Sequence, residues 1–143
     1  MRFFIFLIIS AAFFVSCEEE NIIVDALLIE ANNILPNSNW ELIDTLDSDS
    51  LHNGWNVNLS FFDTTGSQLS WFPAGVNQLR FEYTISKDAN YSDAPLLRLI
   101  SDNNSIEHKY LIRSVSSSEL LLELVKSSQY SFTEDVFVYY EAD

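Results

Sequence analysis

A strict alternation of apolar and polar side chains constrains this sequence more than any other feature. It is clearest from Leu79 to Ile85, where every second residue is large and apolar and the residues between are polar or charged. Successive side chains of a β-strand point to opposite faces, so this pattern predicts a strand with one face in a core and the other in water. The same period of two continues through residues 55–61 and 106–113. The pattern predicts an all-β protein.

Shorter apolar runs between turn residues predict the remaining strands. Together, the sequence predicts about eight short strands, at residues 39–44, 55–61, 68–72, 79–85, 95–101, 106–113, 120–125 and 135–140. The links are short, which implies antiparallel neighbours in a meander, and residues 87–94 are interpreted as a polar loop. Eight such strands can close into an up-and-down barrel, which leaves no exposed edge. A two-sheet β-sandwich has the same local pattern and is the alternative fold.

A segment with a different period precedes these strands. Between Val24 and Leu35 apolar residues recur at spacings of three and four, which is typical of an amphipathic helix. Pro36 ends this helix. The β-branched residues 22–24 leave an early strand as the alternative. As a helix, the segment would lie across one end of the following domain.

The N-terminus has the layout of a secretory signal peptide. Arg2 supplies a positive charge, and residues 3–15 are apolar except for Ser10. This run has little more than half of the roughly 20 residues that a membrane-spanning helix needs, and small Ser16 follows it. The sequence therefore predicts three parts: a signal peptide (1–16), a segment with the cysteine, an acidic tether and the helix (17–36), and a β-barrel domain (37–143).

Cys17 is the only cysteine in the chain. The four residues Phe14-Val15-Ser16-Cys17 resemble the lipobox of bacterial lipoproteins, although that motif more often has leucine where Phe14 stands. The resemblance implies that Cys17 receives a diacylglycerol, becomes the mature N-terminus and anchors the protein in the bacterial outer membrane through diacylglycerol and palmitate chains. A lone cysteine in an exported chain has no partner for an internal disulfide, and lipidation removes its reactive thiol.

Three glutamates, Glu18 to Glu20, follow this cysteine. The run resembles the surface-export signal of lipoproteins from Bacteroidetes-type bacteria, and its alternative interpretation is a solvated tether. Both the periplasmic and the surface-exposed face of the outer membrane therefore stay open. The whole chain has a formal net charge of −14, which argues against nucleic acid and anionic membrane surfaces as partners.

Two stretches within the predicted strands resemble small bacterial lipocalin-like lipoproteins. One is residues 110–122, in which Tyr-Leu-Ile leads through a serine-rich turn to Glu-Leu-Leu-Leu, and the other is residues 39–42 with Trp40. The resemblance implies a small barrel that can enclose a cavity, and it implies no substrate. The chain departs from the family at Ser38, where a glycine two positions before the tryptophan is typical.

Two groups of polar residues have the residue types of known sites but not their spacing. Residues 47–53 are rich in oxygen ligands, but Leu51 stands where a calcium loop needs a ligand, so we expect a solvated loop and no metal. Asp63-Thr64-Thr65-Gly66 lacks the second copy that an aspartic-protease pair needs, so we interpret it as a turn. The sequence contains no Gly-x-Ser-x-Gly motif either. We expect neither an enzyme nor a cofactor.

The candidate binding residues come from the predicted inward faces of the strands. His108 is the titratable residue that the alternation places on an apolar face, and such a histidine is more often a hydrogen-bonded core residue than a catalytic one. An eight-stranded barrel can hold one small ligand or be filled by its own side chains. A ligand cavity would be lined by Trp55, Phe61, Phe81, Tyr83, His108 and Tyr110.

Two functions follow as alternatives. The first is a lipid-anchored binding module that holds a small apolar or amphipathic ligand inside the barrel. The second is a structural or interaction lipoprotein whose outer surface binds an envelope protein or a glycan, for which the loop aromatics Trp71, Tyr91 and Tyr130 are candidates. A cavity lined by apolar side chains would favour the first function, and a filled barrel with an exposed aromatic patch would favour the second.

Overall fold

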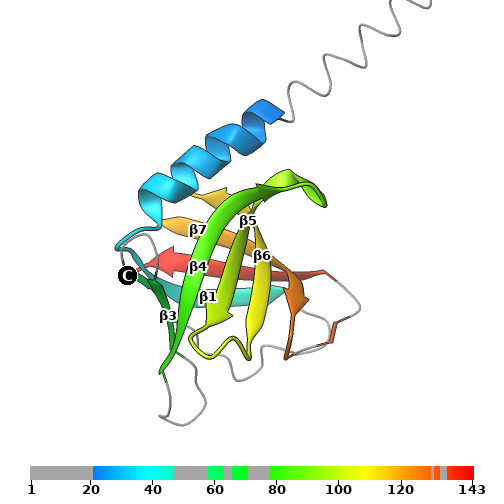
Figure 1. Cartoon of the computed structure of the whole chain (residues 1–143). Coiled ribbons are helices and arrows are strands. Elements are labelled where there is room, and N and C mark those ends of the chain that lie inside the picture. Colours follow the sequence, from blue (N-terminus) through cyan, green and yellow to red (C-terminus); the bar gives the residue numbers. More distant parts are fainter. Residues whose placement is uncertain (1–20, 47–57, 63–65, 71–77, 130, 133–134) are drawn as a thin grey trace, which may run out of the picture.

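The computed structural model describes residues 21–46, 58–62, 66–70, 78–129, 131–132 and 135–143 (Figure 1). Several features singled out in the sequence lie outside these ranges. These features are the signal peptide, Cys17, the acidic run, the 47–53 loop, the 63–65 turn, Trp55, Trp71 and Tyr130.

Eight antiparallel strands form a closed barrel in the part of the chain that the structure describes. The strands are β1 (Asn39–Leu46), β2 (Asn58–Phe62), β3 (Gly66–Ser70), β4 (Gln78–Asp88), β5 (Tyr91–Ser101), β6 (Glu107–Val115), β7 (Glu119–Ser127) and β8 (Val136–Ala142). Each strand pairs with its neighbours in sequence, and β8 pairs with β1 to complete the circle. The predicted eight-stranded barrel is confirmed, and the β-sandwich alternative is wrong.

The segment 87–94, which the sequence analysis interprets as a polar loop, is mostly strand. β4 continues to Asp88 and β5 begins at Tyr91, so only Ala89 and Asn90 form the turn. Oδ1 of Asp88 accepts hydrogen bonds from the backbone N and from Nδ2 of Asn90, each 2.9 Å long. These bonds lower the pKa of the Asp88 carboxyl. The polar composition of this segment reflects the exposure of a long hairpin, not the absence of strands.

The barrel interior is built from the apolar phase of the alternation. On β4 the side chains of Phe81 and Tyr83 are buried, whereas Glu82 and Thr84 between them are exposed. Strand residues that face each other in register lie on the same side of the sheet, so the inward phase continues around the barrel. On β5, β6 and β7 some residues of the other phase are buried as well. The buried strand residues of this core are Trp40, Leu59, Phe61, Phe81, Tyr83, Leu97, Leu99, Tyr110, Ile112, Val115, Leu120, Leu122, Leu124, Val136, Val138 and Tyr140.

A helix closes one end of this barrel, as the sequence predicts (Figure 1). Its described part covers residues 21–34, so the strand alternative for residues 22–24 is wrong. Ala31 within the helix and Leu35 just after it are fully buried against the barrel core. Leu27 packs beside them. An ion pair between Asp25 and Lys87 joins the helix to β4. The helix therefore belongs to the same hydrophobic core as the strands.

The connection from the helix to β1 is fixed by a short chain of hydrogen bonds. Asn37 has a φ of 59°, a left-handed conformation that asparagine tolerates and that commonly ends a helix. The backbone N of Ser38 then donates to the carbonyl of Leu35 over 3.1 Å, and its Oγ donates to the same carbonyl over 2.5 Å. Nε1 of buried Trp40 donates to Oγ of Ser38 over 2.6 Å. The serine that departs from the family pattern is thus a partner of both the helix and the tryptophan.

Candidate functional site

The residues predicted to line a ligand cavity meet inside the barrel. Phe61, Phe81, Tyr83, His108 and Tyr110 are all buried in the interior, and Trp55 lies outside the described residues. Their rings form contacts with one another. Phe61 and Tyr83 pack edge to face with centroids 4.9 Å apart, and the His108 ring lies 5.9 Å from Phe81 and 6.3 Å from Tyr110. These rings therefore take up part of the described interior.

His108 lies deep in this core. Its side chain is 1% exposed, and its position on β6 is in register with Leu99 on β5 and Ser127 on β7. The second histidine, His52, is outside the described residues. Within the described ranges, no group of histidine, cysteine and carboxylate side chains is arranged to hold a metal ion. The core interpretation of His108 therefore fits its burial.

Tyr140 on β8 completes the buried aromatic set near the closure of the barrel. Burial raises the pKa of its hydroxyl, and the nearby Tyr110 raises it further. A phenol that titrates only at high pH stays neutral under ordinary conditions, so it is present here as an uncharged core residue. Tyr140 therefore cannot act as an acid or a base near neutral pH.

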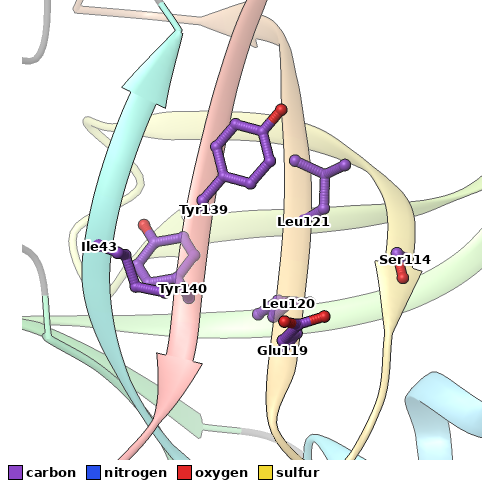
Figure 2. Close-up of a pocket in the computed structure, with 7 residues that line it drawn as sticks. All are labelled: Ile43, Ser114, Glu119, Leu120, Leu121, Tyr139 and Tyr140. Atoms are coloured by element: carbon purple, nitrogen blue, oxygen red, sulfur yellow. The ribbon is translucent and has the colours of Figure 1, made fainter.

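A concave surface of different character lies on the outside of the barrel wall. We call it the outer-wall groove, a pocket of about 270 Å³ that crosses β1, β8, β7 and β6 and is lined by Ile43, Ser114, Glu119, Leu120, Leu121, Tyr139 and Tyr140 (Figure 2). Leu121 is in register with Tyr139 on one side and with Ser114 on the other. Figure 2 shows Tyr139 and Leu121 side by side on neighbouring strands, with Ile43 and Ser114 to either side. Leu120 and Tyr140 are inward-facing residues, so they form its floor.

Both strands that flank the outer-wall groove are irregular. The pairing of β1 with β8 shifts between Leu42 and Asp44, which leaves Ile43 as the extra residue. The pairing of β6 with β7 shifts between Ile112 and Ser114. A β-bulge bends its strand and re-aims the side chain at the irregularity, and bulges are common beside functional sites. Ile43 is accordingly 59% exposed, a high value for an isoleucine in a strand.

A row of like charges borders the outer-wall groove. Glu41 on β1 is in register with Glu141 on β8, and Glu141 is in register with Glu119 on β7. All three side chains are exposed, and none of them forms an ion pair with another described residue. We call these three residues the carboxylate row. Like charges directly opposite each other across strands are destabilising, so this row weakens the pairing of three adjacent strands.

Several carboxylates elsewhere on the wall have basic partners. Arg113 donates to Glu123 over 2.5 Å and to Asp93 over 2.6 Å, and its hydrogen bond lowers the pKa of Asp93. Glu107 accepts from Arg98 over 2.7 Å and from Lys126 over 3.2 Å, and these bonds lower its pKa, with the Arg98 bond having the larger effect. The carboxylate row differs from these residues in having no such partner among the described residues, and from other unpaired carboxylates in the register that places its three members side by side.

The outer-wall groove was not predicted from the sequence, although one signal for it is present. In residues 120–122 and 136–140 both phases of the alternation are apolar. Such runs indicate that the outward face is apolar as well as the inward one. Of the loop aromatics considered for surface binding, Tyr91 is not among the residues that line this groove. Tyr91 is the first residue of β5 and packs against Ala94, Leu96 and Leu111, and Trp71 and Tyr130 are outside the described residues.

No helix within the described residues is long and apolar enough to cross a membrane. Comparison with known proteins gives no match to a protein-family model and none to a curated protein. Among solved structures, the chain is similar to one described as the de novo design of a fluorescence-activating β-barrel, with a TM-score of 0.52 and 12% sequence identity, over 80% of this chain and 98% of that one. At this identity the likeness concerns the fold alone, and it agrees with a β-barrel.

Proposed function

We propose that this protein is a non-enzymatic binding module of the bacterial cell envelope, anchored by lipid on Cys17, which binds its partner through the outer-wall groove. The observation that carries the proposal is an apolar groove open to solvent on the outside of the barrel. A partner's apolar group would enter between Tyr139, Leu121 and Ile43.

The large side chains inside the barrel favour binding at the outer surface. A small barrel either holds a ligand or packs its own side chains, and here the interior positions carry Trp40, Phe61, Phe81, Tyr83 and Tyr110, all buried. Exposed apolar surface with a polar rim is typical of an interaction site. The outer-wall groove has such a composition, with Ser114 and Glu119 at its edge.

The anchor rests on the sequence at the N-terminus. A positive residue, a short apolar run and Ser16-Cys17 match the layout of a lipoprotein signal. Stable anchoring takes more than one acyl chain, which the diacylglycerol of a lipoprotein supplies. The barrel would then stand at the outer membrane, on its periplasmic or its outer face, with the wall free to meet other envelope molecules.

A small apolar or amphipathic ligand in the barrel interior is the second candidate function. Five of the predicted lining residues meet there, with His108 as a polar group among aromatic rings. The similar solved barrel is described as fluorescence-activating, which makes an interior site worth testing in the same experiment. Such a ligand would have to fit beside these rings or displace them.

Nuclear magnetic resonance on the isotopically labelled full chain tests both candidates. We expect indole, a neutral apolar probe, to shift the amide signals of Ser114, Leu121 and Tyr139. Ile43→Asp, at an exposed position of the outer-wall groove, should abolish these shifts. Phe62→Asp is the matched control, because Phe62 is also an exposed strand residue, on β2.

The pattern of shifted signals decides between the outcomes. Shifts confined to Tyr83, His108 and Tyr110 would support an interior ligand and contradict the outer-wall proposal. An indole titration without shifts at either place would contradict both candidate functions.

A further inference from the structure

We infer that the outer-wall groove binds a basic segment of a partner protein, in which an apolar side chain is flanked by lysine or arginine. This inference rests on the proposed function and specifies the chemistry of its partner. The apolar side chain would occupy the groove, and the cationic groups would lie on the carboxylate row.

The first argument is the position of the carboxylate row. Glu141 lies two positions after Tyr139 along β8, and Glu119 lies two positions before Leu121 along β7. With a rise of about 3.3 Å per residue, the charged row lies roughly 7 Å from the apolar row, on the same outer face. The apolar side chain of the partner segment could therefore lie in the outer-wall groove while a neighbouring basic side chain of the same segment contacts the carboxylate row.

The second argument is that the protein itself does not neutralise the row. Glu41, Glu141 and Glu119 are exposed and in register, and they form no ion pair with other described residues. Four of the described basic residues, Lys87, Arg98, Arg113 and Lys126, are paired with other carboxylates. A destabilising row without internal compensation is the kind of local conflict that marks functional surfaces. An external cation removes the repulsion.

The third argument favours a protein segment over a small free amine. Neighbouring strands are about 4.8 Å apart, so the carboxylate row over three strands is roughly 10 Å wide. A single ammonium group contacts only part of such a row, whereas two basic side chains of one segment cover it. Tyr139 adds an aromatic face beside the row, which suits a cation or an apolar side chain. The net charge of −14 would steer a basic partner toward the protein.

The experiment uses short capped peptides and isothermal titration calorimetry on the full chain. The main probe has phenylalanine between two lysines. One matched peptide has glutamate in place of both lysines, and another has glycine in place of phenylalanine. We expect the main probe to bind, both matched peptides to bind at least tenfold more weakly, and the affinity of the main probe to fall as salt is raised.

Variants of the protein locate the interaction. Glu119→Gln and Glu141→Gln should each weaken the main probe by about two- to fivefold, as expected for exposed charge pairs. Glu82→Gln, at an exposed carboxylate on β4, is the control and should leave the affinity unchanged. Ile43→Asp should remove binding of the apolar side chain while it leaves the carboxylate row in place.

Three results would overturn the inference. They are equal binding of the lysine and glutamate peptides, an unchanged affinity in both Gln variants, and binding of phenethylamine as tight as that of the main probe. If indole still shifts the amides of the outer-wall groove in any of these cases, the proposed function stands and only the partner chemistry is wrong. If indole shifts nothing there, the proposed function fails as well.

Discussion

The indole Nε1 of Trp40 donates a 2.6 Å hydrogen bond to Oγ of Ser38, which itself donates to the carbonyl of Leu35. Trp40 is buried at the start of β1, and Leu35 is buried just after the helix. One hydroxyl group therefore connects the helix that closes the barrel with the first strand of its wall. This pair shows how the two parts of the chain form one core.

Ser38→Ala should lower the free energy of unfolding by about 1–3 kcal/mol, because it leaves the buried Nε1 of Trp40 without this acceptor. Denaturant unfolding measures the change. Ser117→Ala, in an exposed turn, is the control and should change stability by less than about 0.5 kcal/mol. Equal effects of the two substitutions would contradict the structural role of Ser38.

Glu141→Gln should raise the free energy of unfolding by about 0.2–1 kcal/mol at low salt, because Glu141 has a like charge in register on each side. The gain should shrink at high salt, where exposed charges are screened. Glu82→Gln provides the comparison at an exposed glutamate outside the carboxylate row. A loss of stability in Glu141→Gln would show that the row is not repulsive.

The Glu107 carboxyl should make stability depend on acid pH. Hydrogen bonds from Arg98 and Lys126 lower its pKa in the folded protein below the ordinary value of 4.5. Its stabilising contribution is therefore present above pH 4.5 and is lost as the pH falls through the lower, folded-state pKa. Denaturant unfolding between pH 6 and pH 3 should show a smaller loss of stability in Glu107→Gln than in the native chain. Equal slopes in both proteins would contradict the role of these bonds.

Phe81→Ala should lower the free energy of unfolding by about 3–5 kcal/mol, because it opens a cavity in the core beside His108. If the variant still folds, its cavity should bind benzene, as apolar cavities of this kind do. Thermal unfolding with and without benzene measures both effects. A loss below about 1 kcal/mol would mean that Phe81 borders empty space in the native barrel, as an interior ligand site requires.

Cys17→Ser should abolish membrane association, because it removes the predicted acceptor of the lipid. Partitioning of the expressed protein between detergent and aqueous phases measures this. Ser16→Ala, which keeps a small residue before the cysteine, should leave the partitioning unchanged. Continued partitioning of Cys17→Ser into the detergent phase would rule out the lipoprotein interpretation.

The alternation of side chains was sufficient to predict which residues face the core. Phe81 and Tyr83 are buried and Glu82 is exposed, as their positions in the sequence require. Burial of every second residue is a local property of a strand, so it can be read without knowing the partner strand. The same reasoning placed five of the six candidate interior residues inside the barrel, and the helical period at Ala31 and Leu35 correctly indicated the helix that covers it.

Tertiary structure decided the closure of the sheet and the composition of its outer surface. A barrel and a sandwich share the same local pattern, and only the pairing of β8 with β1 distinguishes them. Ile43 is turned outward at a bulge, which exists only relative to the partner strand. Glu41, Glu119 and Glu141 are far apart in sequence and become neighbours through strand register. Such relationships are long-range, so the local period of the sequence determined the strands, and their pairing created the outer-wall groove.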